Sequence, residues 1–203
     1  LFDIHGEYGP ITEGNVKHYK IAGPTDNLSD DVLFLPYWLL TYEEMMSLMI
    51  DRSDNNAPNQ AMLFSRTVLE KKKDFLEQNG KEDMVDNITI DSPIPYSMDR
   101  LIEKLSFYNT EMVPGVKSEK KGDFNGQLSR FIQRLESKKY DKRLNFMFCS
   151  DDKLLDYDYM SSLCSKLMSS ASNGGGVKII DFSEVPSDIL PLIVSLIARV
   201  IFV

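Results

Sequence analysis

The chain has 203 residues, of which 42% are hydrophobic and 27% are charged, a composition that predicts a globular protein and excludes a disordered one. Its net charge of −8 excludes a surface coated uniformly in basic residues for nucleic-acid binding, although 23 Lys and Arg leave room for a local basic groove. The two cysteines, Cys149 and Cys164, exclude a disulfide framework and a four-cysteine zinc site.

The two ends of the chain bear on its localisation. The N-terminus lacks the basic region and the cleavage site of a secretory signal. The final run DILPLIVSLIARVIFV is shorter than the roughly 20 apolar residues of a membrane span and contains Arg199, so it predicts a buried helix. We therefore expect a cytoplasmic protein without membrane contact. Because both ends are apolar, whereas native termini are usually polar and frayed, we also expect a segment of a longer protein.

The first part of the chain, residues 1–40, predicts extended structure. A short buried strand is expected at 1–4, and further extended segments are expected in VKHYKIA (16–22) and DVLFLPYWLL (31–40). The turn-rich stretch GPTDNLSD separates the last two segments.

The middle of the chain, residues 41–139, predicts a mostly helical insertion. Thr41 and Glu44 have the spacing of a capping box, which marks a helix start. The next helix is expected over 57–79 and ends before Gly80.

That long helix has an apolar stripe that should face a core. The stripe consists of Ala61, Phe64, Val68, Leu69 and Leu76. The charged stretch EKKKD (70–74) is expected to face water. After it, Ser97 should cap a helix beginning at Met98, 115–123 should be a polar loop, and 125–139 should form another helix.

The tail, residues 140–203, alternates strands and helices. Strands are expected at 144–148 and 177–183 and helices at 158–172 and from Pro186 onward, with Asn173-Gly-Gly-Gly ending the first helix. This order favours a parallel sheet. The sequence therefore predicts an α/β fold in which a partial parallel sheet, built from 1–40 and 140–203, carries the helical insertion.

The stretch DIHGEY places Asp3, His5 and Glu7 directly after the first predicted strand. Ligands bind at the carboxyl ends of parallel strands, so these side chains could hold Mg²⁺ or orient a water molecule. A structural turn held by local side-chain hydrogen bonds explains the same residues equally well. Zinc-deaminase chemistry is excluded, because Cys149 and Cys164 are too far apart in the sequence for its Cys-x-x-Cys pair.

Two further patterns concern phosphate binding. The glycines in SNGGGVK follow a predicted helix and precede a strand, which is the wrong order for a phosphate loop, and no Gly-x-x-x-x-Gly-Lys-Ser/Thr occurs in the chain. The stretch RFIQRLESKKYDKR interleaves basic and aromatic residues, as a nucleic-acid surface does, although a solvated helix face also explains it. Its candidate DNA contacts are Arg130, Arg134, Lys138 and Lys139.

Taken in order, five segments resemble the HerA-type ATPases of the HerA/FtsK clade of P-loop DNA-translocating motors. They are FDIHGEY, LFLPYWLLTYEEMMSLM, DSPIPYSMDRLIEKL, YDKRLNFMF and VKIIDFSEVPSDILPLIVSLIARVIF. The resemblance implies a RecA-like ATPase that assembles as a homo-hexamer and pumps double-stranded DNA using ATP and Mg²⁺. It also implies a NurA-like nuclease or another effector as a partner.

The same resemblance implies that Asp3, His5 and Glu7 lie near the nucleotide phosphates and the metal. The phosphate loop is expected before residue 1, and the Walker B carboxylates and the arginine finger after residue 203. The cofactor-binding residues are therefore unassigned. We expect the isolated chain to hold no cofactor tightly and to turn over no ATP.

An alternative hypothesis is a non-catalytic module that binds a nuclease, an effector or a neighbouring subunit. Aromatic and methionine side chains are enriched at such interfaces. Its candidate partner surface consists of Tyr37, Trp38, Met45 and Met49, and a core position explains the same residues.

Overall fold

The computed structural model describes residues 1–169 and 175–202, and it divides the chain into two compact units. Unit 1 comprises Leu1–Leu39 and Asp141–Val203, and unit 2 comprises Leu40–Tyr140. These bounds lie one residue from those expected from the sequence. A contiguous unit is thus inserted into a discontinuous one, and the fold is α/β with a parallel sheet and a helical insertion, consistent with a partial RecA-like fold.

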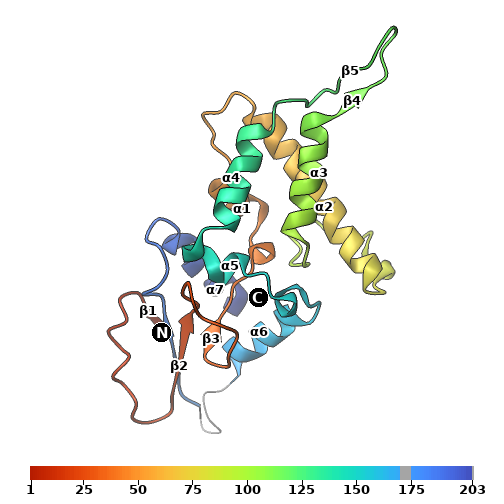
Figure 1. Ribbon diagram of the computed structural model, residues 1–203. Coiled ribbons are helices and arrows are strands. Elements are labelled where there is room, and N and C mark those ends of the chain that lie inside the picture. Colours follow the sequence, from red (N-terminus) through yellow and green to blue (C-terminus); the bar gives the residue numbers. More distant parts are fainter. Residues whose placement is uncertain (170–174, 203) are drawn as a thin grey trace. The chain divides into compact units, whose positions relative to one another are not determined.

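Unit 1 is built around a four-stranded sheet with the order β1-β6-β2-β3 (Figure 1). Its strands are β1 (Phe2–Asp3), β2 (Val16–Ile21), β3 (Val32–Leu33) and β6 (Val177–Asp181). All neighbouring strands are parallel, as the sequence predicts. The strand from the end of the chain thus lies between the first two, so both halves of unit 1 are needed to form the sheet.

Helix α6 (Tyr159–Met168) is tied to the sheet through its backbone. The Tyr19 hydroxyl and the Lys178 ammonium both donate to the carbonyl of Lys166, at 3.2 and 2.5 Å. The predicted helix was longer and ran to residue 172; residues 170–172 of that extension lie outside the described residues. The final helix, α7 (Leu190–Phe202), begins four residues after Pro186 and buries Ile193, Leu196, Ile197 and Val200.

The strand predicted at 144–148 is wrong. A 3₁₀ turn at Lys142–Leu144 runs into the single-turn helix α5 (Asn145–Phe148). The Asp141 carboxylate caps this start by accepting the Arg143 N–H at 3.0 Å. A short, fully buried apolar run looks alike in either conformation, and here the cap selects the helix.

The segment 31–40 is extended only at its beginning. After β3 the chain turns into a 3₁₀ turn at Tyr37–Leu39. The Trp38 indole N–H donates to the Leu154 carbonyl at 2.9 Å, and the Tyr37 ring stacks on Phe148 with centroids 5.4 Å apart. Leu154 belongs to a further 3₁₀ turn at Asp152–Leu155. These contacts pack the turn in the core of unit 1.

Unit 2 is helical and has its own core. Its helices are α1 (Tyr42–Met49), α2 (Ala57–Gln78), α3 (Met98–Thr110) and α4 (Ser129–Lys139), with a 3₁₀ turn at Glu82–Met84 after α2. The capping box predicted at Thr41 is confirmed, as is the Ser97 cap of α3. The rings of Phe64 and Phe131 meet edge to face, with centroids 5.7 Å apart, and join α2 to α4.

Two features of unit 2 differ from the prediction. The stretch 70–74 does not face water throughout, because Lys72 is only 1% exposed. The loop predicted at 115–123 belongs to a short antiparallel hairpin formed by β4 (Met112–Val113) and β5 (Lys120–Lys121).

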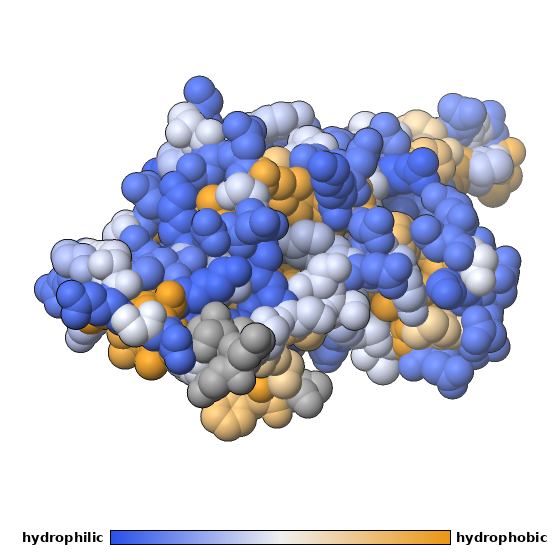
Figure 2. All heavy atoms as spheres, turned by 90° about the horizontal axis from the view of Figure 1, so that it is seen from below, coloured by the Kyte–Doolittle hydropathy of each residue, from blue (hydrophilic) through white to orange (hydrophobic). Residues whose placement is uncertain are grey.

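The exposed large apolar side chains are scattered along the chain, from Leu1 to Phe202. The face shown in Figure 2 is mostly hydrophilic, with apolar residues in separate patches. Within the described ranges, no helix combines the length and the apolar composition that a membrane crossing requires.

Candidate functional site

The carboxyl end of the parallel sheet in unit 1 carries a row of charged residues. Asp3 of β1 lies in register with Asp181 of β6, and Asp181 with Lys20 of β2. Because the strands are parallel, all three side chains come from the same edge of the sheet, where α/β proteins bind their ligands. Of this row, only Asp3 was predicted from the sequence as a site residue.

Asp3 holds the turn that follows β1. Its side chain is buried, and its carboxylate accepts the backbone N–H groups of Glu7 at 3.1 Å and Tyr8 at 2.9 Å. Burial alone would raise the pKa of Asp3, but the N–H groups of residues 5–8 outweigh burial and hold that pKa below its ordinary value of 3.8. Gly6 has a φ of 71° in this turn, a conformation that glycine adopts without strain.

His5 and Glu7 are exposed on the same turn. The structure therefore separates the three predicted site residues into one buried carboxylate, engaged by backbone amides, and two side chains that face solvent. Asp3 therefore has the role of the second explanation, in which local side-chain hydrogen bonds hold a structural turn. Among the described residues, no group of three or more His, Cys, Asp and Glu side chains is arranged to hold a metal ion.

Lys20 and Asp26 form an ion pair at this edge of the sheet. The Lys20 ammonium lies 2.7 Å from an Asp26 oxygen, and the Gly23 N–H donates to the same carboxylate at 2.8 Å. The hydrogen bond from Lys20 and then that from Gly23 hold the pKa of Asp26 below its ordinary value. This pair fixes the loop that leaves β2.

A cavity of about 230 Å³ adjoins the charged row. Its lining includes the three charged members of the row and residues from β2, β3 and the loop after β1: Asp3, Gly9, His18, Tyr19, Lys20, Asp31, Val32 and Asp181. The rule that singled out Asp3, a carboxylate leaving a buried strand, also applies to Asp181. The place of Lys20 in this row follows only from the pairing of β2 with β6, which cannot be read from the sequence.

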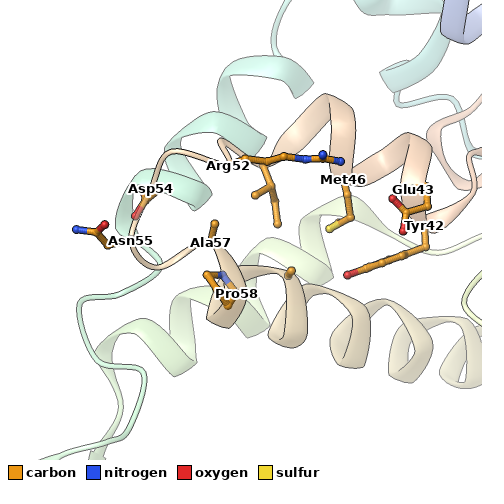
Figure 3. A pocket seen from close by; sticks show the side chains of 10 residues that line it. Tyr42, Glu43, Met46, Arg52, Asp54, Asn55, Ala57 and Pro58 are labelled. Carbon is orange, nitrogen blue, oxygen red and sulfur yellow. The ribbon is translucent and has the colours of Figure 1, made fainter.

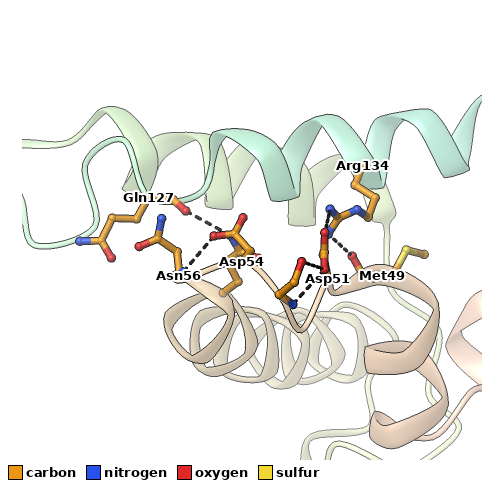
Figure 4. Close-up of polar contacts among 8 residues, drawn as sticks. Met49, Asp51, Asp54, Asn56, Gln127 and Arg134 are labelled. Carbon is orange, nitrogen blue, oxygen red and sulfur yellow. Dashed lines mark hydrogen bonds and ion pairs between the residues drawn. The ribbon is translucent and has the colours of Figure 1, made fainter.

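The four candidate DNA contacts lie on α4 or at its end. Arg134 reaches the loop after α1, where it donates to the Met49 carbonyl at 3.3 Å and pairs with Asp51 at 3.4 Å (Figure 4). Lys139 is ion-paired with Asp99 of α3. Arg130 is exposed, and Lys138 is partly exposed. Two of the four cations therefore tie elements of unit 2 together.

The predicted partner surface is not exposed, because all four of its residues are buried. Tyr37 and Trp38 of unit 1 and Met45 and Met49 of unit 2 are each at most 6% exposed. Aromatic and methionine side chains fill apolar space as readily as they form interfaces, and here they belong to the core. The exposure on which the interaction-module hypothesis depended is absent.

Unit 2 has a pocket of about 510 Å³ between α1 and the start of α2 (Figure 3). Its apolar lining is Met46, Ile50, Ala57, Pro58 and Ala61, and its polar lining is Tyr42, Glu43, Arg52, Asp54 and Asn55. No single sequence motif marks this pocket, because α1, α2 and the loop between them all contribute residues to its lining.

The chain shares its sequence pattern with a known protein family. No curated protein matches it. Among protein families, residues 1–201 match the family described as Helicase HerA, central domain. That match covers both halves of the parallel sheet and the whole helical insertion. The chain therefore belongs to the HerA helicase central-domain family.

Proposed function

We propose that the chain is the central part of a HerA-type ATPase that assembles as a homo-hexamer and translocates double-stranded DNA. The observation that carries this proposal is the family match over residues 1–201. The charged row at the carboxyl edge of a parallel sheet supports it, because nucleotides bind at that edge in α/β folds. A NurA-like nuclease is the proposed partner.

In this proposal Asp3 is a positioning residue. Its carboxylate holds the backbone of residues 5–8, and this turn presents the exposed side chains of His5 and Glu7 at the carboxyl edge. ATP, bound with Mg²⁺, supplies the phosphoryl chemistry that drives translocation. Glu7 would face the nucleotide, where a carboxylate can orient water or accept a proton.

The test is ATP hydrolysis stimulated by double-stranded DNA, measured on the protein expressed as its complete reading frame. Glu7→Gln should lower the stimulated rate about 100-fold, the usual contribution of a positioned acid or base. It should leave the melting temperature unchanged, because the Glu7 side chain is exposed. Asp3→Asn should lower both the rate and the melting temperature, because it weakens the turn.

Glu13→Gln is the matched control, since Glu13 is an exposed glutamate in the same β1–β2 connection. Wild-type protein without DNA-stimulated hydrolysis would contradict the proposed function. If Glu7→Gln were as active as Glu13→Gln, the role of Glu7 would be wrong. A hexamer in native mass spectrometry is the expected assembly.

A further inference from the structure

The β4–β5 hairpin of unit 2 extends beyond α3 and α4, the two helices that it connects (Figure 1). Only two residues of each strand are paired, with Met112 opposite Lys121 and Val113 opposite Lys120. At the tip, Gly115 comes so close to the Ser118 carbonyl that a Cβ there would clash with it. The next residue, Val116, has its side chain fully in solvent.

The base of the hairpin is firmly attached to unit 2. The Gly122 N–H and the Asn125 side-chain amide both donate to the Glu111 carbonyl, at 2.9 and 3.1 Å. The Asn109 side chain accepts the Leu128 N–H at 2.9 Å just before α4. These hydrogen bonds join the end of α3 to the approach to α4, so the hairpin is an arm on a fixed base.

The arm is basic, although the chain as a whole is acidic. Residues 112–121 contain three lysines and one glutamate, a net charge of +2, whereas the whole chain carries −8. Lys117, Lys120 and Lys121 are all exposed, and within the described part of the chain none of them is paired with a carboxylate. By contrast, Arg134 and Lys139 of α4 are held in ion pairs.

Lysines on an exposed edge can also serve to prevent strands of different molecules from pairing. That explanation does not account for this hairpin, because two paired residues per strand offer too short an edge to need such protection. It also leaves the exposed Val116 unexplained. Unpaired cations around an apolar tip match a polyanion with apolar surface between its charges, and duplex DNA has this character: phosphates line its grooves, and proteins insert apolar side chains into them.

We propose that residues 112–121 contact duplex DNA, with the three lysines on its phosphates and Val116 entering a groove. This inference rests on the proposed function, in which double-stranded DNA is the substrate, and it places a contact outside the α4 residues that the sequence suggested.

The test measures binding of a fluorescent 30-base-pair duplex by the complete reading frame at several salt concentrations. The test variant is K117Q/K120Q/K121Q. The control, K73Q/K142Q/K153Q, removes the same charge from lysines elsewhere in the chain. Each lost phosphate contact should reduce the slope of log affinity against log salt by about 1, so the hairpin variant should lose about 3. Its affinity at 0.1 M salt should fall about 10- to 100-fold.

The hairpin substitutions should shift the melting temperature by less than about 2 °C, because all three lysines are exposed. If wild-type protein bound the duplex and the hairpin variant had the same affinity and salt slope, the hairpin inference would be overturned and the proposed function would stand. Equal losses in the hairpin and control variants would also overturn it, since they would reflect net charge alone. Wild-type protein that did not bind duplex DNA would overturn both.

Discussion

Lys72 is the residue whose position departs most from the sequence analysis. It lies in α2 within EKKKD, and its ammonium donates to the carbonyls of Ile90 at 2.5 Å and Ser92 at 2.6 Å. Burial lowers the pKa of Lys72 to about 8, and the nearby Asp91 carboxylate opposes this effect. The lysine thus joins α2 to the loop that precedes α3.

The pKa of Lys72 predicts how stability depends on pH. It is below the ordinary 10.5 of an unfolded chain, so between about pH 8 and 10.5 the unfolded state binds more protons than the folded state. Stability should therefore rise with pH in this window, relative to a variant that lacks the group. We expect the unfolding free energy of wild type, minus that of Lys72→Met, to increase by roughly 1 kcal/mol for each unit that the pH rises.

Urea unfolding from pH 7.5 to 9.5 measures this difference. Lys73→Met is the control for loss of a lysine from this turn of α2, because Lys73 follows Lys72 directly in the sequence and is only partly buried. A flat difference for Lys72→Met would show that the folded protein does not depress this pKa.

The burial of Lys72 could be predicted in part from its spacing in the sequence. Lys72 lies four residues after Val68 and four before Leu76, so helical periodicity puts it on the apolar stripe. The charged composition of its neighbours argued for solvent. The two carbonyls that make its burial tolerable come from a loop 18 and 20 residues away, and no local pattern could reveal them.

Among the secondary-structure elements, α1 has a start that local sequence specified on both sides of its cap. The Thr41 hydroxyl accepts the Glu44 N–H at 3.3 Å, and the Glu44 carboxylate accepts the Thr41 N–H at 2.8 Å. Both partners lie within four consecutive residues, so local sequence was sufficient to predict the cap.

Loss of this cap should destabilise unit 2. Thr41→Ala removes the hydroxyl that accepts the Glu44 N–H in the first turn of α1, and we expect it to lower the free energy of unfolding by ~1 kcal/mol. Ser47→Ala is the control, because that exposed hydroxyl donates only to a carbonyl within the same helix. Denaturant unfolding followed by circular dichroism compares the two. Equal stabilities would mean that water replaces the cap without cost.

The element that was assigned wrongly, 144–148, shows the opposite case. Its apolar residues are all buried whether the chain is extended or helical, so hydrophobicity does not discriminate. The informative residue was Asp141, whose capping pattern lies just upstream. The hairpin at 112–121 was missed for a related reason, since two paired residues per strand leave almost no alternation in the sequence.

For the whole molecule, the sequence predicted a parallel sheet interrupted by a helical insertion. It could not predict that β6 lies between β1 and β2, because strand order depends on packing between segments that are distant in the chain. The candidate site depends on this order. Asp3, Asp181 and Lys20 are separated by up to 178 positions in the sequence, and only the register brings them into one row.

The most direct test of the central claim is calorimetric titration with Mg-ATPγS. The account predicts that the complete reading frame binds the nucleotide and that Glu7→Gln changes the heat or the affinity of binding. It also predicts that residues 1–203 alone do not bind, because they contain no phosphate-loop motif. Failure of the complete reading frame to bind, or binding by residues 1–203 alone, would contradict the account.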